Sequence, residues 1–224
     1  KDAYVTYTAD GHIEGWVITM PEYVKKYQPG ATVPLYFSAV LDRKPESYGS
    51  FHGNTQLTDA KESKGTGAGM YFTFSNEQQE AVTAKIGLSY TSVENARINL
   101  QAEAEGKTFE DAKEQAHQIW QEYLGRIEVE TSKKEDKVKF YTGLYHALLG
   151  RGLANDVNGA YPRNDGSVGQ LPMKEGKPQY NVYNTDAAWG AQWNLSQLWT
   201  LAYPEYMSEY VSSHIQAYKD AGWL

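Results

Sequence analysis

The chain contains no cysteine among its 224 residues, which excludes disulfide bonds and cysteine-ligated metal sites. It also contains no apolar run of about 18 residues, so the sequence predicts no membrane-spanning helix. No segment is rich in lysine and arginine, and 28 acidic residues outnumber 21 basic ones, giving a net charge of −7. A nucleic-acid partner is therefore not expected.

Several common catalytic motifs are missing as well. The five histidines, at positions 12, 52, 117, 146 and 214, show no HExxH or other paired spacing, and no Ser-His-Asp arrangement can be traced. Residues 65–69 (GTGAG) lack the Lys-Ser/Thr ending of a phosphate-binding loop, and a strand-like run follows them instead of a helix. Nucleotide binding is therefore not predicted.

The chain has no signal peptide, begins with Lys1 and stops at Leu224 in mid-pattern. We expect it to be a piece of a longer protein, so the missing targeting signal says nothing about the parent. The absence of cysteine fits an exported bacterial protein, and a periplasmic or extracellular location is the expectation.

Aromatic residues are abundant, with 6 Trp, 18 Tyr and 6 Phe making up 13% of the chain. Tyrosine and tryptophan combine a flat apolar face with a polar edge. Sugars have the complementary anatomy, an apolar C–H face surrounded by hydroxyls. The composition therefore favours a carbohydrate-facing protein, while ordinary core packing remains the alternative for any single ring.

Hydrophobic periodicity divides the chain into a strand-rich part, up to about residue 105, and a helical part. Period-two alternation and turn residues predict strands of an antiparallel sandwich at 3–8, 15–19, 33–41, 69–74 and 81–90. Helical spacing predicts helices from Thr108, with a capping box to Asp111, and over roughly 135–149, 185–202 and 205–220. Residues 151–183 are predicted to be loop.

The predicted third helix carries the sharpest local pattern. At about 100° per residue, one stripe collects Asp186, Trp189, Trp193, Ser196 and Thr200. The opposite stripe, which we predict to be the packing face, collects Ala187, Ala191, Leu195, Leu198 and Leu201. A carboxylate next to two indoles fits a sugar subsite, in which the carboxylate accepts hydrogen bonds from hydroxyls. The alternative is that Asp186 is a helix cap.

Residues 155–165 (NDVNGAYPRND) form a loop rich in oxygen ligands, including Asp156. Such a loop is compatible with a hard cation such as Ca²⁺, although its spacing is not that of an EF-hand. The alternative is that the Asn and Asp side chains form turns through their own hydrogen bonds.

Several segments, in this order and spacing, resemble glycoside hydrolase family 92, the calcium-dependent exo-acting α-mannosidases. They are 85–97 (KIGLSYTSVENAR), 120–129 (WQEYLGRIEV), 139–149 (KFYTGLYHALL) and 155–161 (NDVNGAY). The resemblance is close over about 80–224 and loose before that. It implies the end of a β-sandwich over 1–105, a helical linker over 106–134 and the first helices of an (α/α)6 barrel over 135–224.

The resemblance further implies an enzyme that removes terminal α-mannose from mannose-containing glycans with inversion and with Ca²⁺ as cofactor. Inversion needs a carboxylic acid and a carboxylate flanking a water, and in the family these groups and most metal ligands lie beyond this chain. We therefore assign no catalytic residue and no metal ligand here, and expect the chain alone to be inactive. A non-catalytic glycan-binding protein of similar architecture is the alternative, and a hydrolase of another sugar is a third possibility.

Two departures from the family pattern concern substrate preference. Asp186 is the counterpart of a family Asp that touches mannose, but Thr185 replaces the Trp that commonly precedes it. Where the family commonly has DVDGRY, this chain has DVNGAY, with Asn158 and Ala160 as the differences. The substrate-binding residues that we predict are Asp186, Trp189, Trp193, Asp156 and Tyr161.

Overall fold

The computed structural model describes residues 2–20, 22–27, 29–75, 80–149, 152–184 and 188–222. The chain forms two compact units, and each is described by itself. The first comprises Lys1–Gly106 and Asp156–Ala160, and the second comprises Lys107–Asn155 and Tyr161–Leu224. A short loop from the later part of the sequence therefore folds as part of the first unit.

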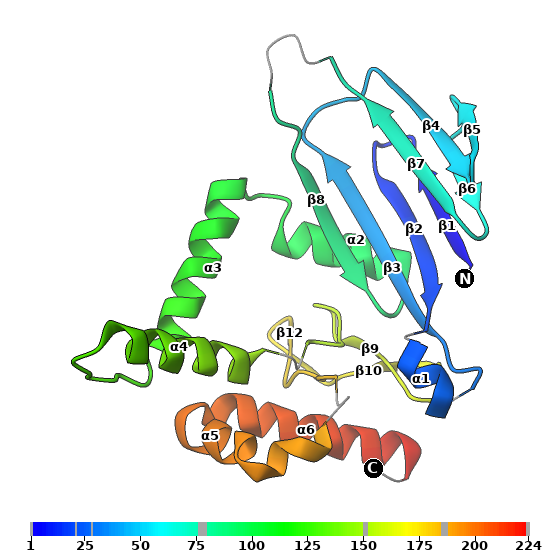
Figure 1. Ribbon diagram of the computed structural model, residues 1–224. Helices are drawn as coiled ribbons and strands as arrows, with labels where there is room; N and C mark the ends of the chain where they lie inside the picture. Colours follow the sequence, from blue (N-terminus) through cyan, green and yellow to red (C-terminus); the bar gives the residue numbers. More distant parts are fainter. Residues whose placement is uncertain are drawn as a thin grey trace. The chain divides into compact units, whose positions relative to one another are not determined.

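The first unit is built on a five-stranded antiparallel sheet with strand order β6-β1-β2-β3-β8 (Figure 1). Its strands are β1 (Ala3–Tyr7), β2 (Ile13–Thr19), β3 (Val33–Leu41), β6 (Glu62–Lys64) and β8 (Ala84–Ser89). Four of these strands lie where the alternation predicts them. β6 was not predicted, because three residues are too few to show a period.

A three-stranded sheet with order β5-β4-β7 packs against the first sheet. It consists of β4 (Ser47–His52), β5 (Thr55–Thr58) and β7 (Ala68–Thr73), of which only β7 was predicted. The ring of Tyr7 on β1 meets Tyr48 and Phe72 edge-on, with centroids 5.1 and 5.3 Å apart. The core of this sandwich thus lies on the Tyr7 face of the five-stranded sheet.

Helix α2 (Val93–Glu103) packs on the other face of that sheet, whereas the sequence predicted strand up to about residue 105. The prediction was wrong because the helix gains its stability from tertiary contacts and not from a strongly amphipathic pattern. Ala96 and Leu100 are buried against Gly87 of β8, where an added Cβ would lie 2.2 Å from the Ala96 carbonyl oxygen. A short helix α1 (Glu22–Tyr27), also unpredicted, follows β2.

The second unit is mainly helical, and its helix ends follow local sequence signals. Helix α3 (Phe109–Leu124) begins with the predicted capping box between Thr108 and Asp111 and ends at Gly125. Helix α4 (Lys134–Leu148) starts one residue before the prediction. Helix α6 (Pro204–Ala221) ends at Gly222, whose φ of 75° is the left-handed conformation that glycine adopts readily.

The predicted third helix is not continuous. A 3₁₀ helix η1 (Ala188–Trp193) is followed by α5 (Leu195–Ala202), and residues 185–187 lie outside the described residues. Because 3₁₀ and α-helices turn by different angles per residue, the two stripes predicted at 100° do not persist through Asn194. Leu201, predicted to pack, is 85% exposed, whereas Trp199 is 1% exposed.

The core of the second unit is aromatic. Leu144, Trp199, Tyr203 and Tyr210 are buried together, with partly buried side chains of α3 to α6 around them. Trp199 meets the rings of Tyr206 and Tyr210 edge-on at 5.0 and 5.3 Å. The aromatic excess of the sequence is therefore partly ordinary core.

The segment predicted as loop, 151–183, contains four short strands in two pairs. β9 (Ala160–Pro162) pairs with β10 (Val168–Gln170), and β11 (Met173–Lys174) pairs with β12 (Lys177–Pro178). Over the residues that the structure describes, no helix is both long enough and apolar enough to cross a membrane.

Candidate functional site

In the first unit, the carboxylate of Asp156 lies at the centre of a buried polar cluster. Asp156 is 2% exposed. Its Oδ2 accepts hydrogen bonds from the hydroxyls of Ser89 (3.0 Å) and Thr91, and its Oδ1 accepts one from Asn99 Nδ2 (2.7 Å). Buried carboxylates are tolerated only with such donors around them. The cluster therefore fixes the loop 156–160 to β8 and α2.

Further amides extend this cluster along α2. Asn99 Oδ1 accepts from the backbone N–H of Val157 (3.0 Å), and Asn95 Oδ1 accepts from Asn158 Nδ2 (2.8 Å). Asn95 Nδ2 in turn donates to Thr91 Oγ1 (2.7 Å). Thr91, Asn95 and Asn99 are spaced by four residues, which is the spacing of one helix face. That spacing was the sequence signal for this set, and it was missed because the segment was not predicted as helix.

In the second unit, Tyr161 is buried in another polar cluster at the end of α6. Its hydroxyl donates to Asp220 Oδ2 (2.8 Å) and accepts from Gln216 Nε2 (2.7 Å). The other carboxylate oxygen of Asp220 lies 3.3 Å from Arg163 Nε. Gly169 lies against the tyrosine ring, where an added Cβ would come within 2.3 Å. These contacts hold the segment after Tyr161 on the last turns of α6.

Burial is the main cause that raises the pKa of Tyr161, so the phenol stays protonated and donates to Asp220. Asp156 and Tyr161 therefore both contact protein groups in this structure. Neither contact tests whether these residues bind a substrate, and that assignment stays a prediction.

The segment before the predicted third helix is held on α6. Tyr183 donates its hydroxyl to Glu209 Oε2 (2.5 Å), which also accepts from Asn181 Nδ2 (3.1 Å). The buried hydroxyl of Ser213 accepts from the Tyr183 backbone N–H (2.9 Å) and donates to the Asn181 carbonyl (3.0 Å). Burial and the bond to Glu209 raise the pKa of Tyr183, which keeps this donor protonated. No local sequence pattern pointed to Glu209, because its partner Tyr183 lies 26 residues away.

Of the three predicted residues of the third helix, the structure describes the side chain of Trp193. Asp186 lies outside the described residues, and so does the side chain of Trp189. Trp193 is 76% exposed at the end of η1, so its indole is available to a ligand. The expectation that these residues act together stays a prediction.

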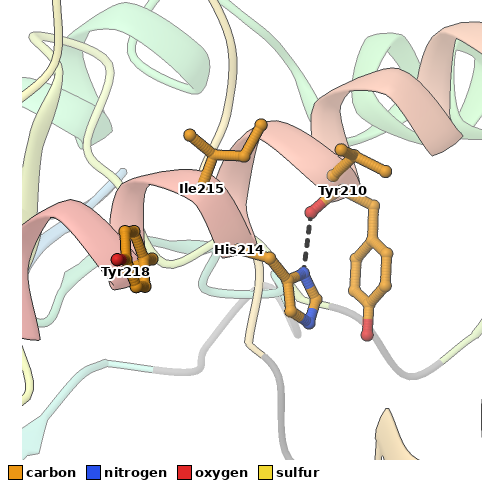
Figure 2. Close-up of a pocket in the computed structure, with 5 residues that line it drawn as sticks. Tyr210, His214, Ile215 and Tyr218 are labelled. Carbon is orange, nitrogen blue, oxygen red and sulfur yellow. Dashed lines mark hydrogen bonds between the residues drawn. The ribbon is translucent and has the colours of Figure 1, made fainter. Parts of the chain in front are cut away.

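A separate apolar groove runs along α6 and is lined by Tyr210, Val211, His214, Ile215 and Tyr218 (Figure 2). Its volume is about 430 Å³. The Nδ1–H of His214 donates to the backbone carbonyl of Tyr210 (2.9 Å). Among the predicted substrate-binding residues whose side chains the structure describes, none lines this groove, and its lining offers few polar groups to orient a sugar.

The oxygen-rich loop does not fit a hard cation. Ca²⁺ requires roughly six to eight oxygen ligands, but the Asp156 oxygens accept protein hydrogen bonds, and Asn158 Oδ1 accepts from the Ala160 N–H (3.1 Å). Asp165 Oδ1 likewise accepts from the N–H of Ser167 (2.9 Å). Within the described ranges, no group of three or more His, Cys, Asp or Glu side chains could hold a metal ion. Asn158 and Asp165 thus form turn bonds of the predicted kind, whereas Asp156 bonds to residues that are distant in the sequence.

Comparison with known families gives two adjacent matches. The glycosyl hydrolase family 92 N-terminal domain matches residues 1–89, and the glycosyl hydrolase family 92 catalytic domain matches residues 95–224. A search of curated proteins found no match.

Solved structures of family 92 enzymes resemble the chain along its whole length. The α-mannosidase BT3965 from Bacteroides thetaiotaomicron aligns with a TM-score of 0.85 at 21% identity, over 99% of this chain and 29% of its own. The inverting mannosidase BT2199 from Bacteroides thetaiotaomicron VPI-5482 aligns with a TM-score of 0.85 at 24% identity, over 100% of this chain and 29% of its own. This chain thus spans less than a third of the length of these structures.

These alignments confirm the predicted fold class, an antiparallel β-sandwich part followed by the first helices of an α/α barrel. The predicted limits of the linker and the barrel part are not tested and stay predictions. Because the catalytic-domain match alone covers more than half of the sequence, the chain belongs to glycosyl hydrolase family 92.

Proposed function

We propose that the protein to which this chain belongs removes terminal α-linked mannose from mannose-containing glycans. The observation that carries the proposal is the ordered match of both family 92 domains, together with the alignment of 99% of this chain to 29% of a structure described as an α-mannosidase. One of these structures, of BT3965, is a complex with mannoimidazole. The chain supplies sandwich, linker and the first barrel helices of such an enzyme.

The proposed reaction proceeds with inversion and is calcium-dependent. In an inverting glycosidase, one carboxylic acid protonates the leaving oxygen while a carboxylate activates a water on the opposite side of the sugar. A bound Ca²⁺ supplies electrostatic stabilisation and orientation of substrate oxygens. The resemblance to the family, in which these groups and most metal ligands lie further along the barrel domain, leads us to place the ion and both carboxylates in the rest of the protein.

Within this chain, Asp186, Trp189 and Trp193 are the proposed substrate contacts of the barrel part. A carboxylate accepts hydrogen bonds from sugar hydroxyls, and an exposed indole such as that of Trp193 offers an apolar face to a pyranose ring. The hydrogen bond from the Tyr183 hydroxyl to Glu209 holds the chain just before this segment. Asp156 and Tyr161 are the other two residues of this chain that we propose as substrate-binding.

The experiment that tests the proposal is an assay of the intact parent protein with a panel of aryl glycosides. We expect release from the α-mannoside, loss of activity with a calcium chelator and recovery on adding Ca²⁺, with the inverted anomer detected by NMR. Cleavage of another aryl glycoside in its place would reassign the substrate. A parent that binds mannose-rich glycans and releases no mannose would favour a non-catalytic glycan-binding protein.

The 224-residue chain alone is proposed to be inactive, because the catalytic pair lies outside it. The parent is further proposed to be periplasmic or extracellular, where glycan substrates are encountered. Mannose release by the isolated chain would contradict the assignment of the missing carboxylates. Fractionation of the native cells tests the location.

A further inference from the structure

Three aromatic side chains form a row across the five-stranded sheet of the first unit. In the strand register, Tyr4 of β1 is paired with Trp16 of β2, and Trp16 is paired with Tyr36 of β3. The same row continues to Lys64 on β6 and to Ser89 on β8. Directly paired residues of neighbouring strands point to the same face of a sheet. Tyr4, Trp16 and Tyr36 therefore share one face.

This face does not point into the core of the sandwich. Tyr7, which contacts the second sheet, is an odd number of residues from Tyr4 and so points to the opposite face. On the aromatic face, helix α2 packs over the next row, where Ala96 and Leu100 meet Gly87 and Arg97 binds Glu14. The aromatic row thus lies on the outer face of the sandwich, beside α2.

The geometry of the row suits a flat ligand. The rings of Tyr4 and Trp16 are 6.4 Å apart between centroids and are inclined by only 31°. All three aromatic residues are half-buried, so each keeps part of its surface exposed to solvent. Neighbouring strands lie about 4.8 Å apart, and the three side chains therefore extend over roughly 10 Å. This length matches about two linked pyranose rings.

Polar groups border the row on both sides. Tyr4 donates its hydroxyl to Glu62 Oε2 (2.9 Å), and Lys64 is exposed at the β6 end. At the β8 end, Ser89 bonds to Asp156, and the half-buried amides of Asn95 and Asn158 are bonded to each other. Partly exposed aromatic residues bordered by charged and amide groups match the two kinds of surface that a sugar presents.

We propose that Tyr4, Trp16 and Tyr36 form a carbohydrate-binding platform on the sandwich, separate from the substrate residues assigned to the barrel part. Its ligand is a linear oligosaccharide with about two pyranose rings stacked on the aromatic row. The mannose class of this oligosaccharide rests on the proposed function.

The experiment is a titration of the 224-residue chain with α-linked mannotriose, followed by NMR of the tryptophan indole N–H signals and by calorimetry. We expect the Trp16 signal, assigned with Trp16→Phe, to shift on titration. Trp16→Ala should raise Kd at least about tenfold, and Tyr36→Ala should raise it in the same direction. Tyr4→Phe keeps the ring and should leave Kd within about twofold.

The matched control is Tyr218→Ala, which removes an exposed aromatic ring from α6 and should leave Kd unchanged. Circular dichroism checks the fold of each variant, and the Trp16 signal of the unmodified chain gives an answer even if Trp16→Ala does not fold. A Trp16 signal that does not move, or a Kd that Trp16→Ala leaves unchanged, overturns the inference. If the parent is active but the Trp16 signal does not respond, only this inference is overturned. If the parent is inactive but the Trp16 signal responds, only the proposed enzymatic function is overturned.

Discussion

At the scale of single residues, Asp156 lies in the oxygen-rich loop, and its carboxylate accepts hydrogen bonds from protein side chains. Ser89 on β8, Asn99 on α2 and Thr91 between them donate to its oxygens, and the loop that carries it is anchored by the backbone N–H of Val157 as well. Hydrogen bonds to a charged group contribute about 1.5–3 kcal/mol each, and a donor left without its partner is costly. Asp156 is therefore expected to dominate the stability of this junction.

We predict that Asp156→Ala lowers the free energy of unfolding by about 3 kcal/mol, because three buried donors lose their acceptor. Asp156→Asn keeps an acceptor and should cost less, about 1 kcal/mol. Urea unfolding measures both. The control is Asp165→Ala, an exposed carboxylate of the same stretch, for which about 0.5 kcal/mol or less is expected. An equal cost for Asp156→Ala and Asp165→Ala would show that the cluster is not an anchor.

Asp186 carries the second prediction at this scale. In the intact parent, Asp186→Ala should lower kcat/KM at least about tenfold, because a charge-assisted hydrogen bond to a sugar hydroxyl is lost. The thermal midpoint should stay nearly unchanged. Asp136→Ala, which removes an exposed acid from the first turn of α4, is the matched control. Normal activity with a stability loss of about 1 kcal/mol would make Asp186 a helix cap only.

At the scale of elements, Arg97 ties helix α2 to the hairpin of β1 and β2. Its Nε lies 2.7 Å from Glu14 Oε1, and its Nη1 lies 2.7 Å from Asp10 Oδ2. The hydroxyl of Thr8 donates to the other oxygen of Asp10 (2.6 Å). The Thr8 hydroxyl, followed by Arg97, lowers the pKa of Asp10 to about 2.

Because the folded pKa of Asp10 lies below its ordinary value of 3.8, its contribution to stability is present above that value and is lost as the pH falls towards about 2. NMR titration of the carboxyl carbon should give a pKa of about 2. Thr8→Ala and Arg97→Met should each raise it. The pKa of Asp42, which is lowered by the Thr83 N–H, should not respond to Arg97→Met. An Asp10 pKa at its ordinary value in the unmodified chain would contradict the contact.

The region of the third helix offers a comparison of two tryptophans. Trp199 is buried in the aromatic core and donates its indole N–H to the Ala147 carbonyl (3.3 Å), whereas Trp193 is exposed. We predict that Trp199→Ala lowers the free energy of unfolding by about 3–5 kcal/mol. Trp193→Ala should change it by about 0.5 kcal/mol or less. Chemical denaturation measures both, and similar costs for the two variants would be inconsistent with the observed packing.

At the scale of the whole molecule, the chain exposes apolar side chains on regular elements. Val211, Ile215 and Tyr218 are exposed along the α6 groove, and Ile86 and Leu88 are exposed on β8. Each square ångström of apolar area removed from water contributes about 25 cal/mol. Exposed surfaces of this kind favour association.

We therefore predict that the 224-residue chain self-associates, with a mass that rises with concentration in light scattering coupled to size-exclusion chromatography. Val211→Lys combined with Ile215→Glu should shift the chain towards monomer, because charges replace the apolar lining of the groove. Lys113→Glu, a charge change on the polar surface of α3, is the control and should have little effect. A chain that stays monomeric at all concentrations would contradict the prediction.

The sequence by itself determined the features that depend on neighbouring residues. The capping box at Thr108, the helix ends at Gly125 and Gly222, and four strands of the five-stranded sheet follow from spacing within a few residues. The family could also be predicted from the sequence alone, on the residues of segments 85–97, 120–129, 139–149 and 155–161. These signals are readable because caps, turns and period-two alternation act over one or two turns of chain.

Only the tertiary structure decided the features that depend on distant partners. Helix α2 was missed because its polar face bonds to groups such as Asp156 and Glu14, which lie 57 and 83 residues from the helix residues that bind them. The interruption at Asn194 placed Trp199 and not Leu201 in the core. The alignment of Tyr4, Trp16 and Tyr36 exists only through strand register. These features depend on packing and hydrogen bonds between residues that are far apart in the sequence. A short window of sequence does not contain both partners.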